Sequence, residues 1–172
     1  AELKDWLNEQ NSAIIFIPTM GGLHNGHQYL ISKAKERTIK IKQIVLVSIF
    51  INPLQFGKDE DFKQYPRDIK RDAELAFSAG ADAIWAPDYD EVFPGGKDSH
   101  FKIEVPKTLQ NQLCGAERKG HFDGVATVII RLIKIIKPKK LVLGEKDWQQ
   151  LIIIRRLFQE LSIPVRIESY ST

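Results

Sequence analysis

The sequence Pro18-Thr19-Met20-Gly21-Gly22-Leu23-His24-Asn25-Gly26-His27 decides the fold of this chain, because it joins an apolar segment, 13–17, to a stretch with helical patterning. Its three glycines, and the lack of a bulky side chain before Leu23, let the backbone approach a ligand closely. A helix that begins here presents free N–H groups and a positive dipole end to an anion. The pattern therefore predicts a strand that ends in a phosphate-binding turn.

His24 and His27 are the chemically most informative residues of this stretch. They lie three residues apart at the start of the predicted helix, so both imidazoles can reach the same polyphosphate. Imidazole can also deliver a proton near neutral pH. Capping or packing is the alternative role for a histidine at a helix start, but the pairing of two histidines across a glycine favours phosphate binding.

The composition is that of an ordinary globular domain. The chain has 172 residues, 43% hydrophobic and 27% charged, enough for one domain with a substantial core. Its net charge of +3 comes from basic residues scattered among acidic ones, which argues against nucleic-acid binding. Without a membrane-length apolar run or a leader-like segment, we expect a cytoplasmic protein with no membrane partner. The single cysteine, Cys114, excludes an intrachain disulfide.

Short runs rich in isoleucine and valine alternate with amphipathic stretches, which is typical of a parallel sheet covered by helices. The expected strands are 13–17, 44–50, 83–86, 141–143 and 165–168, with 101–105 as a further strand candidate of uncertain partner. No internal repeat or flexible linker is visible, so residues 1–172 are expected to form a single domain.

Helices are expected over 2–9 and from points near Gly26 and after Asp68, Asp123 and Asp147. Each of the three aspartates suits a cap or first-turn position. The helix after Asp123 has one apolar face, formed by Val125, Val128, Ile129, Leu132 and Ile136.

Two further segments follow strands at the carboxyl edge, where open parallel sheets bind ligands. Gln55 comes after the 44–50 strand, and 144–147 comes after the 141–143 strand and opens a helix. A glutamine in a loop and a charged surface turn are the alternative interpretations when each is taken by itself. Together with 18–27, they predict one ligand site at one edge of the sheet.

Five ordered motifs carry a resemblance over nearly the whole chain, at 18–27, 52–57, 65–68, 120–125 and 144–150. Together they resemble the pantothenate synthetase (pantoate–β-alanine ligase) family, within the HxGH nucleotidylyltransferase superfamily that shares its core with class I aminoacyl-tRNA synthetases. The resemblance implies an α/β, Rossmann-like, doubly wound and mainly parallel sheet with helices on both faces. It also implies ATP-dependent condensation of (R)-pantoate with β-alanine through pantoyl-adenylate, giving pantothenate, AMP and pyrophosphate.

The resemblance further implies site residues. His27 matches the family's proton donor, and His24 and His27 match residues that contact triphosphate oxygens. The residues expected to bind ATP are Met20, Gly21, Gly22, Leu23, His24, Asn25, Gly26, His27, Gly144, Glu145, Lys146 and Asp147. The residues expected to bind pantoate are Pro18, Thr19, Asn52, Gln55, Val125, Val128, Ile129 and Gln150.

The chemistry of these residues suits those roles. An amide such as that of Gln55 or Gln150 offers both a donor and an acceptor to a substrate with hydroxyls beside a carboxylate. The geminal methyl groups of pantoate need an apolar wall, although the three residues at 125, 128 and 129 also suit the protein core. Leu143 stands where many relatives have Phe, and Asn25 where many have an acid.

Several roles stay open at this stage. Arg118, Lys119 and His121 either touch pyrophosphate or order their loop, and the sequence does not decide between the two. Mg²⁺ is expected to arrive with ATP, and its protein ligands are unassigned. The acidic run 59–61 is better explained as an exposed helix start than as a magnesium site. A homodimer is expected from the resemblance alone.

The family also carries a second, small domain after the strand that corresponds to 165–168, with a loop that closes over the ATP phosphates. We therefore expect this chain to be the N-terminal, nucleotide-binding portion, with the lid domain absent. Two alternatives are kept. One is a nucleotidyltransferase of another HxGH family that acts on a phosphorylated substrate, and the other is an isolated binding module with little turnover.

Overall fold

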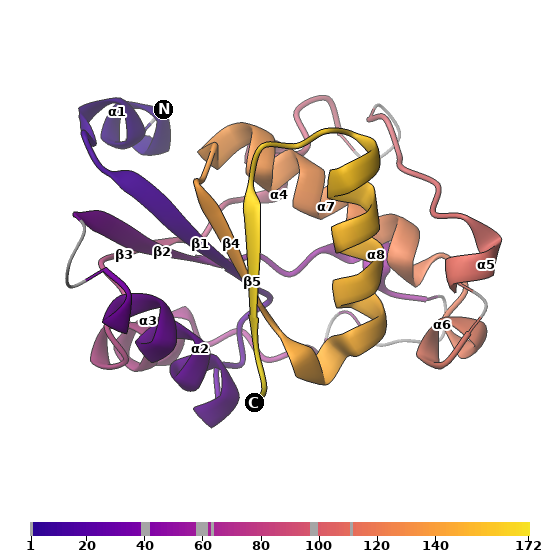
Figure 1. The fold of residues 1–172 in the computed structure, drawn as a ribbon, viewed down its shortest axis with the longest axis horizontal. Coiled ribbons are helices and arrows are strands. Elements are labelled where there is room, and N and C mark those ends of the chain that lie inside the picture. Colours follow the sequence, from indigo (N-terminus) through magenta and orange to yellow (C-terminus); the bar gives the residue numbers. More distant parts are fainter. Residues whose placement is uncertain (1, 39–41, 58–61, 63, 97–99, 111) are drawn as a thin grey trace.

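The computed structural model describes residues 2–38, 42–57, 62, 64–96, 100–110 and 112–172. A five-stranded sheet in the order β3-β2-β1-β4-β5 forms its centre, and every neighbouring pair is parallel (Figure 1). The strands are β1 Ala13–Thr19, β2 Gln43–Ile49, β3 Ala83–Trp85, β4 Lys140–Gly144 and β5 Arg166–Tyr170. The five principal strands expected from the sequence are confirmed, with ends displaced by one or two residues.

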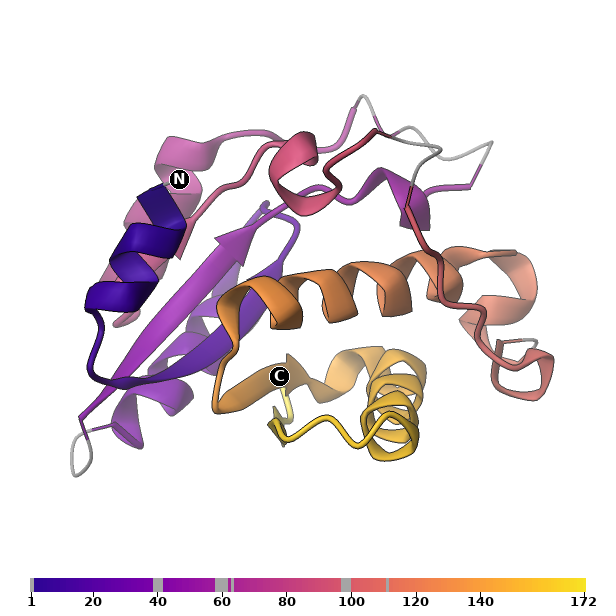
Figure 2. The ribbon, with the colours of Figure 1, turned by 90° about the horizontal axis from the view of Figure 1, so that it is seen from above.

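Helices cover both faces of this sheet, which confirms the doubly wound α/β fold. Helices α2 (Asn25–Glu36) and α3 (Ile69–Ser78) lie on one face, and α7 (His121–Ile136) and α8 (Trp148–Glu160) lie on the other (Figures 1 and 2). The shorter helical elements are α1 Glu2–Glu9, η1 Pro53–Gln55, α4 Tyr89–Val92, α5 Lys107–Gln110, α6 Cys114–Glu117 and η2 Glu145–Asp147.

Alternation along the strands divides the core into two clusters. Phe16 and Leu141 belong to the larger cluster with the apolar face of α7, whereas Ile15, Ile17 and Val142 pack against α2 in the smaller one. Successive strand residues point to opposite faces, so a continuous apolar strand serves both helical layers. The strand order reverses between β1 and β4. This switch point opens a crevice at the carboxyl ends of the strands.

The segment 101–105 is not a strand, contrary to expectation. Its backbone N–H groups find side chains of α7 as partners: the N–H of Ile103 donates to Thr127 Oγ1 over 2.9 Å, and that of Val105 to Asp123 Oδ1 over 2.7 Å. Phe101 is 98% exposed. The extended segment therefore lies against a helix and joins no edge of the sheet.

The helix starts also differ in part from the prediction. Helix α7 begins at His121, after Gly120 in the left-handed region (φ 78°), so Asp123 lies in its first turn. Asp68 caps α3 by accepting from Arg71 N over 3.0 Å, as expected. Asp147 stands at the N-cap of α8 without a side-chain capping bond. The acidic run 59–61 lies outside the described residues.

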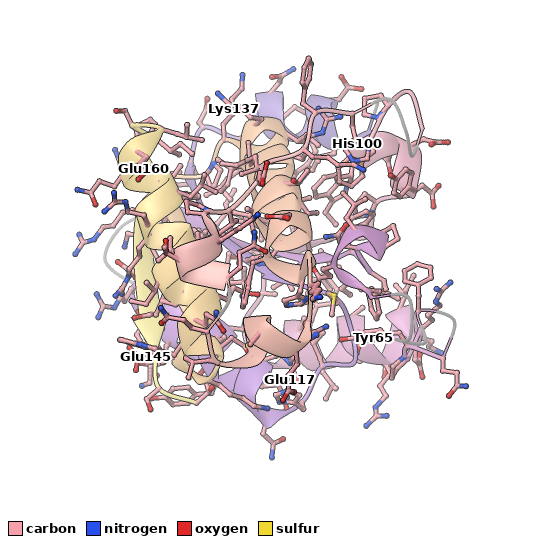
Figure 3. The ribbon with its side chains drawn as sticks, turned by 90° about the vertical axis from the view of Figure 1, so that its right-hand side faces the viewer. Tyr65, His100, Glu117, Lys137, Glu145 and Glu160 are labelled. Carbon is pink, nitrogen blue, oxygen red and sulfur yellow. The ribbon has the colours of Figure 1, made fainter. Side chains whose placement is uncertain are left out.

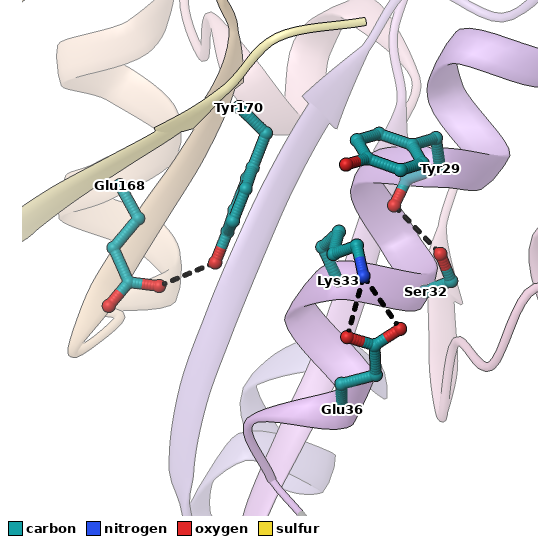
Figure 4. Close-up of polar contacts among 6 residues, drawn as sticks. All are labelled: Tyr29, Ser32, Lys33, Glu36, Glu168 and Tyr170. Atoms are coloured by element: carbon teal, nitrogen blue, oxygen red, sulfur yellow. Dashed lines mark hydrogen bonds and ion pairs between the residues drawn. The ribbon is translucent and has the colours of Figure 1, made fainter.

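A buried ion pair holds the β5 edge of the sheet. Glu168 on β5 lies 3.2 Å from Lys140 Nζ on β4, and both side chains are largely enclosed. The hydroxyl of Tyr170 donates to the same carboxylate over 3.3 Å, and Lys33 and Glu36 pair across from it on α2 (Figure 4). Burial, followed by the charge of Glu168, raises the pKa of Tyr170.

Among the described residues, no helix is long and apolar enough to cross a membrane.

Candidate functional site

A cavity of about 290 Å³ opens at the carboxyl ends of β1, β2 and β4. Figure 3 shows Tyr65 and Glu145 at this end of the molecule, with Lys137 and Glu160 at the opposite end. The described residues that line the cavity are Pro18, Thr19, Met20, His24, Gly26, His27, Leu30, Phe50, Asn52, Gln55, Tyr65, Val125, Val128, Ile129, Leu132, Val142, Leu143, Gly144, Lys146, Asp147, Gln150 and Thr172. All five motifs of the sequence contribute to this lining, although 65–68 contributes Tyr65 alone and 120–125 contributes Val125 alone.

The turn after β1 is built around a carboxylate that the sequence did not single out. Gly21 and Gly22 have φ angles of +85° and +63°, which favour glycine. Asp72, buried on α3, accepts from Gly22 N over 2.9 Å and from Leu23 N over 2.7 Å. A Cβ at Gly21 would lie 2.9 Å from Asp72 Oδ2. The turn therefore directs these two N–H groups at Asp72 and away from the cavity.

The two histidines cap the start of α2 and line the cavity at the same time. Gly26 N donates to His24 Nδ1 over 3.0 Å, and His24 N donates to His27 Nδ1 over 3.4 Å. Because each Nδ1 accepts, the neutral form of each ring carries its proton on Nε2. The ring centroids are 4.2 Å apart. Capping and ligand binding are alternative roles on the sequence alone, yet the geometry allows one ring to do both.

The environment of His27 favours its neutral form. Burial lowers the pKa of His27 below 6.5, and the charge of His24 lowers it further. Asp72 and Asp147 act in the opposite direction but more weakly. A neutral His27 keeps Nδ1 available to accept the capping bond, and its Nε2–H remains a donor for an anion in the cavity.

Gln55 is held by contacts on both of its polar ends. Asn52 Nδ2 donates to Gln55 Oε1 over 3.1 Å and to the carbonyl of Gly124 over 3.0 Å. Gln55 Nε2 lies 2.7 Å from Met20 Sδ, and the side chain is buried. With Oε1 engaged by a donor, the amide presents Nε2–H to the cavity. A Cβ at Gly124 would lie 2.2 Å from Leu54 O, so only glycine lets α7 approach η1 this closely.

The segment after β4 divides its side chains between the cavity and the fold. Lys146, Asp147 and Gln150 line the cavity, whereas Glu145 accepts from Ser169 Oγ over 2.9 Å on β5. The neighbouring Gln149 is buried and faces the other way. Its Oε1 accepts from Gly115 N over 3.2 Å, and its Nε2 donates to the carbonyl of Leu109 over 2.9 Å.

Most of the predicted site is brought together, and a few residues stand apart. The predicted residues that do not line the cavity are Gly21, Gly22, Leu23, Asn25 and Glu145. Tyr65 and Asp72 were not predicted as site residues, although both belong to the region around the 65–68 motif. Tyr65 OH donates to the carbonyl of Gly21 over 3.5 Å, and burial raises its pKa. The signal available in the sequence was their position, since Tyr65 lies in the 65–68 motif and Asp72 follows that motif by one helical turn.

The structure bears on whether the 118–121 loop contacts pyrophosphate or is only ordered by its own side chains. His121 is buried, with Nδ1 2.8 Å from the carbonyl of Gln55 and Nε2 3.1 Å from Arg118 Nη1. Neither residue lines the cavity, and Lys119 is exposed outside it. The contacts favour the loop-ordering role over contact with pyrophosphate.

Comparisons with known proteins identify the family of this chain. The family model for pantoate-beta-alanine ligase matches residues 1–172. A bifunctional pantoate ligase/cytidylate kinase of Prochlorococcus marinus (strain NATL1A) is 89% identical over 172 residues, which are 100% of this chain and 33% of that protein. The chain therefore spans about a third of the length of the curated relatives it matches.

Solved structures show the same architecture. Pantothenate synthetase from Thermus thermophilus has a TM-score of 0.89 at 38% identity, covering 99% of this chain and 60% of that one. Pantoate-beta-alanine ligase from Francisella tularensis, complexed with beta-gamma ATP and beta-alanine, has a TM-score of 0.88 at 38% identity, covering 98% and 63%. The chain belongs to the pantoate-beta-alanine ligase family.

Proposed function

We propose that this chain supplies the ATP- and pantoate-binding part of a ligase that condenses (R)-pantoate with β-alanine to give pantothenate. One observation carries the proposal. His24, His27 and Lys146, which suit a triphosphate, line the same cavity as Gln55 and Gln150, which suit a hydroxy acid. Val125, Val128 and Ile129 add an apolar wall for the geminal methyl groups.

In the first step, the carboxylate of pantoate attacks the α-phosphorus of ATP. A carboxylate–phosphorus bond forms, and the bond to pyrophosphate breaks. Negative charge grows on the departing pyrophosphate, and the Nε2–H donors of His24 and His27 are placed to stabilise it. We assign to His27 a catalytic hydrogen bond from Nε2–H to the departing pyrophosphate, and a positioning role at the phosphates and ribose to Lys146 and Asp147.

In the second step, the amine of β-alanine attacks the carbonyl carbon of pantoyl-adenylate. A carbon–nitrogen bond forms, the bond to AMP breaks, and the amine loses a proton. Holding the two reactants in line within a cavity supplies much of the rate, because it converts an encounter in solution into a local reaction. Gln55 and Gln150 keep the pantoyl group in place between the two steps.

The charge of the cavity separates this function from the runner-up. A nucleotidyltransferase that activates a phosphorylated acceptor needs additional cations around the acceptor phosphate. Among the described residues that line the cavity, Lys146 is the only lysine or arginine. The acceptor end of the space is lined by the amides of Gln55 and Gln150 and by apolar groups, with hydroxyls from Thr19 and Tyr65 elsewhere in the lining. This composition favours an acceptor that carries hydroxyls and methyl groups.

Magnesium is proposed to accompany ATP. Among the described residues, no three His, Cys, Asp or Glu side chains are grouped to hold a metal ion, and Asp147 is the only carboxylate that lines the cavity. Mg²⁺ prefers one or two carboxylates together with phosphate oxygens and water, so this donor set fits an ion carried on the triphosphate. The ion would neutralise phosphate charge.

Two further proposals follow from the family. We propose that the protein acts in the cytoplasm, which suits its single cysteine, Cys114. We also propose that it forms a homodimer. Sedimentation equilibrium tests the second proposal directly, since a mass that stays at that of one chain over a wide concentration range contradicts it.

Calorimetric titration of this 172-residue chain with a stable pantoyl-adenylate analogue tests the function, with ATP alone as the comparison ligand. We expect saturable binding of the analogue that is tighter than that of ATP, because both subsites lie in one cavity. Gln150→Ala is expected to weaken binding of the analogue and to leave binding of ATP unchanged. Equal affinity for the analogue and ATP would contradict the assignment of a pantoate subsite. Pantothenate formation by the full-length protein then tests turnover.

A further inference from the structure

His121 connects the start of α7 to the substrate residue Gln55 from outside the cavity. The imidazole is buried, and its Nδ1 lies 2.8 Å from the carbonyl oxygen of Gln55. A carbonyl oxygen only accepts, so Nδ1 must carry the proton. On the other side of the ring, Arg118 Nη1 lies 3.1 Å from Nε2. A guanidinium only donates, so Nε2 must be the acceptor.

These two contacts define a single tautomer of His121, and it is the opposite of the one found in the cavity. His24 and His27 accept at Nδ1 from backbone N–H groups and therefore carry the proton on Nε2. His121 carries it on Nδ1. The arginine beside His121 selects that form, because a proton on Nε2 would face a cationic donor at hydrogen-bond distance.

A hydrogen bond to the main-chain carbonyl of Gln55 can fix the position of the Gln55 side-chain amide. η1 is a short helix that spans only Pro53–Gln55, so its end has few backbone partners of its own. Asn52 holds the side-chain oxygen of Gln55 over 3.1 Å, and His121 holds its main chain. The two contacts come from different elements, and both are needed to fix the position and the direction of the amide.

We propose that His121 is a positioning residue for pantoate recognition, with Arg118 selecting the His121 tautomer that holds Gln55 in place. The proposal rests on the function proposed above, because it assigns pantoate to Gln55. In this proposal His121 does not touch a substrate and acts only through Gln55. Its effect is therefore confined to the pantoate subsite, and the phosphate-binding residues on α2 and η2 keep their own contacts.

Two amide substitutions separate this role from general packing. In His121→Asn the amide nitrogen replaces Nδ1 and retains a donor for Gln55 O, whereas in His121→Gln it falls near the position of Nε2. We expect H121Q in the full-length protein to raise the KM for pantoate about tenfold, while H121N stays within about threefold of wild type. The KM for ATP is expected to stay within about twofold in both variants. Equal effects of the two variants, or a matching rise in the KM for ATP, would overturn the proposal.

The tautomer provides a test that does not depend on activity or on the folding of a variant. Long-range ¹⁵N–¹H NMR of the wild-type chain at neutral pH should show His121 protonated on Nδ1 and His24 and His27 protonated on Nε2. A proton on Nε2 of His121 would overturn the proposal that Arg118 selects the tautomer that holds Gln55. If the wild-type enzyme makes no pantothenate while His121 has the expected tautomer, the proposed function fails and pantoate is removed from the proposal, which separates the two failures.

Discussion

The carboxylate of Asp72 on α3 accepts a hydrogen bond from the backbone N–H of Leu23 over 2.7 Å, and so occupies the inside of the glycine turn after β1. Its second oxygen accepts from Gly22 N over 2.9 Å. A fixed negative charge therefore stands where a strand-to-helix turn commonly receives phosphate. In the proposed function, phosphate is bound instead by three side chains that line the cavity, His24, His27 and Lys146.

Asp72→Asn should destabilise the protein by about 1–3 kcal/mol, because the amide accepts one N–H but turns a donor toward the other, which stays buried without a partner. Urea unfolding measures this change. Asp68→Asn is the matched control one turn earlier on α3, since Asp68 caps the helix and asparagine caps equally well. The control is expected to change stability by less than about 0.5 kcal/mol. An Asp72→Asn variant whose stability changes no more than that of the control would show that the turn does not depend on this carboxylate.

Protonation of His27 should lower the stability of the fold. Burial and the charge of His24 depress the pKa of His27 below 6.5, so the unfolded chain takes up this proton first as the pH falls. The stabilising contribution is complete above pH 6.5 and is lost as the pH falls through the folded pKa. NMR titration of the imidazole measures that pKa. His24→Asn keeps a good N-cap and removes the repelling charge, so it should raise the pKa of His27.

A His27 midpoint at or above 6.5 in the wild-type chain would contradict burial as the main cause. An unchanged midpoint in H24N would remove His24 as the second cause. Both measurements use the free chain, so they stand apart from the proposed reaction.

The strands and the cavity could be predicted because their signals are local. Runs such as 13–17 are apolar at every position, and the 18–27 motif lies within one turn of the chain. The features that were not predicted, the role of Asp72 and the extended segment 101–105, depend on partners distant in the sequence. Asp72 is 49 residues from Leu23, and Ile103 gives its N–H to Thr127 across 24 residues. A segment that reads as a strand by composition becomes an extended arm when a helix supplies its hydrogen-bond acceptors.

Gly124→Ala should destabilise the protein by at least about 1–3 kcal/mol, because the added methyl group would lie 2.2 Å from Leu54 O and push η1 away from α7. Thermal unfolding measures the loss. Gly144→Ala is the control, with φ −79° and no atom closer than 3.6 Å to the added carbon. It should change stability by less than about 0.5 kcal/mol. Equal stability of the two variants would contradict the close approach of η1 to α7.

Gln149 and Gln150 are adjacent on α8 and should respond oppositely to alanine. Gln149 is buried and bonds Gly115 N and the carbonyl of Leu109, so Gln149→Ala removes both hydrogen bonds and should cost about 1–3 kcal/mol of unfolding free energy. Gln150 lines the cavity, so Gln150→Ala should change stability by less than about 0.5 kcal/mol. Its KM for pantoate should instead rise about tenfold, which corresponds to one lost hydrogen bond of roughly 1.4 kcal/mol. Urea unfolding and pantothenate formation at varied pantoate separate the two effects. A wild-type KM for pantoate in Q150A would contradict the assignment of the Gln150 amide to the pantoate site.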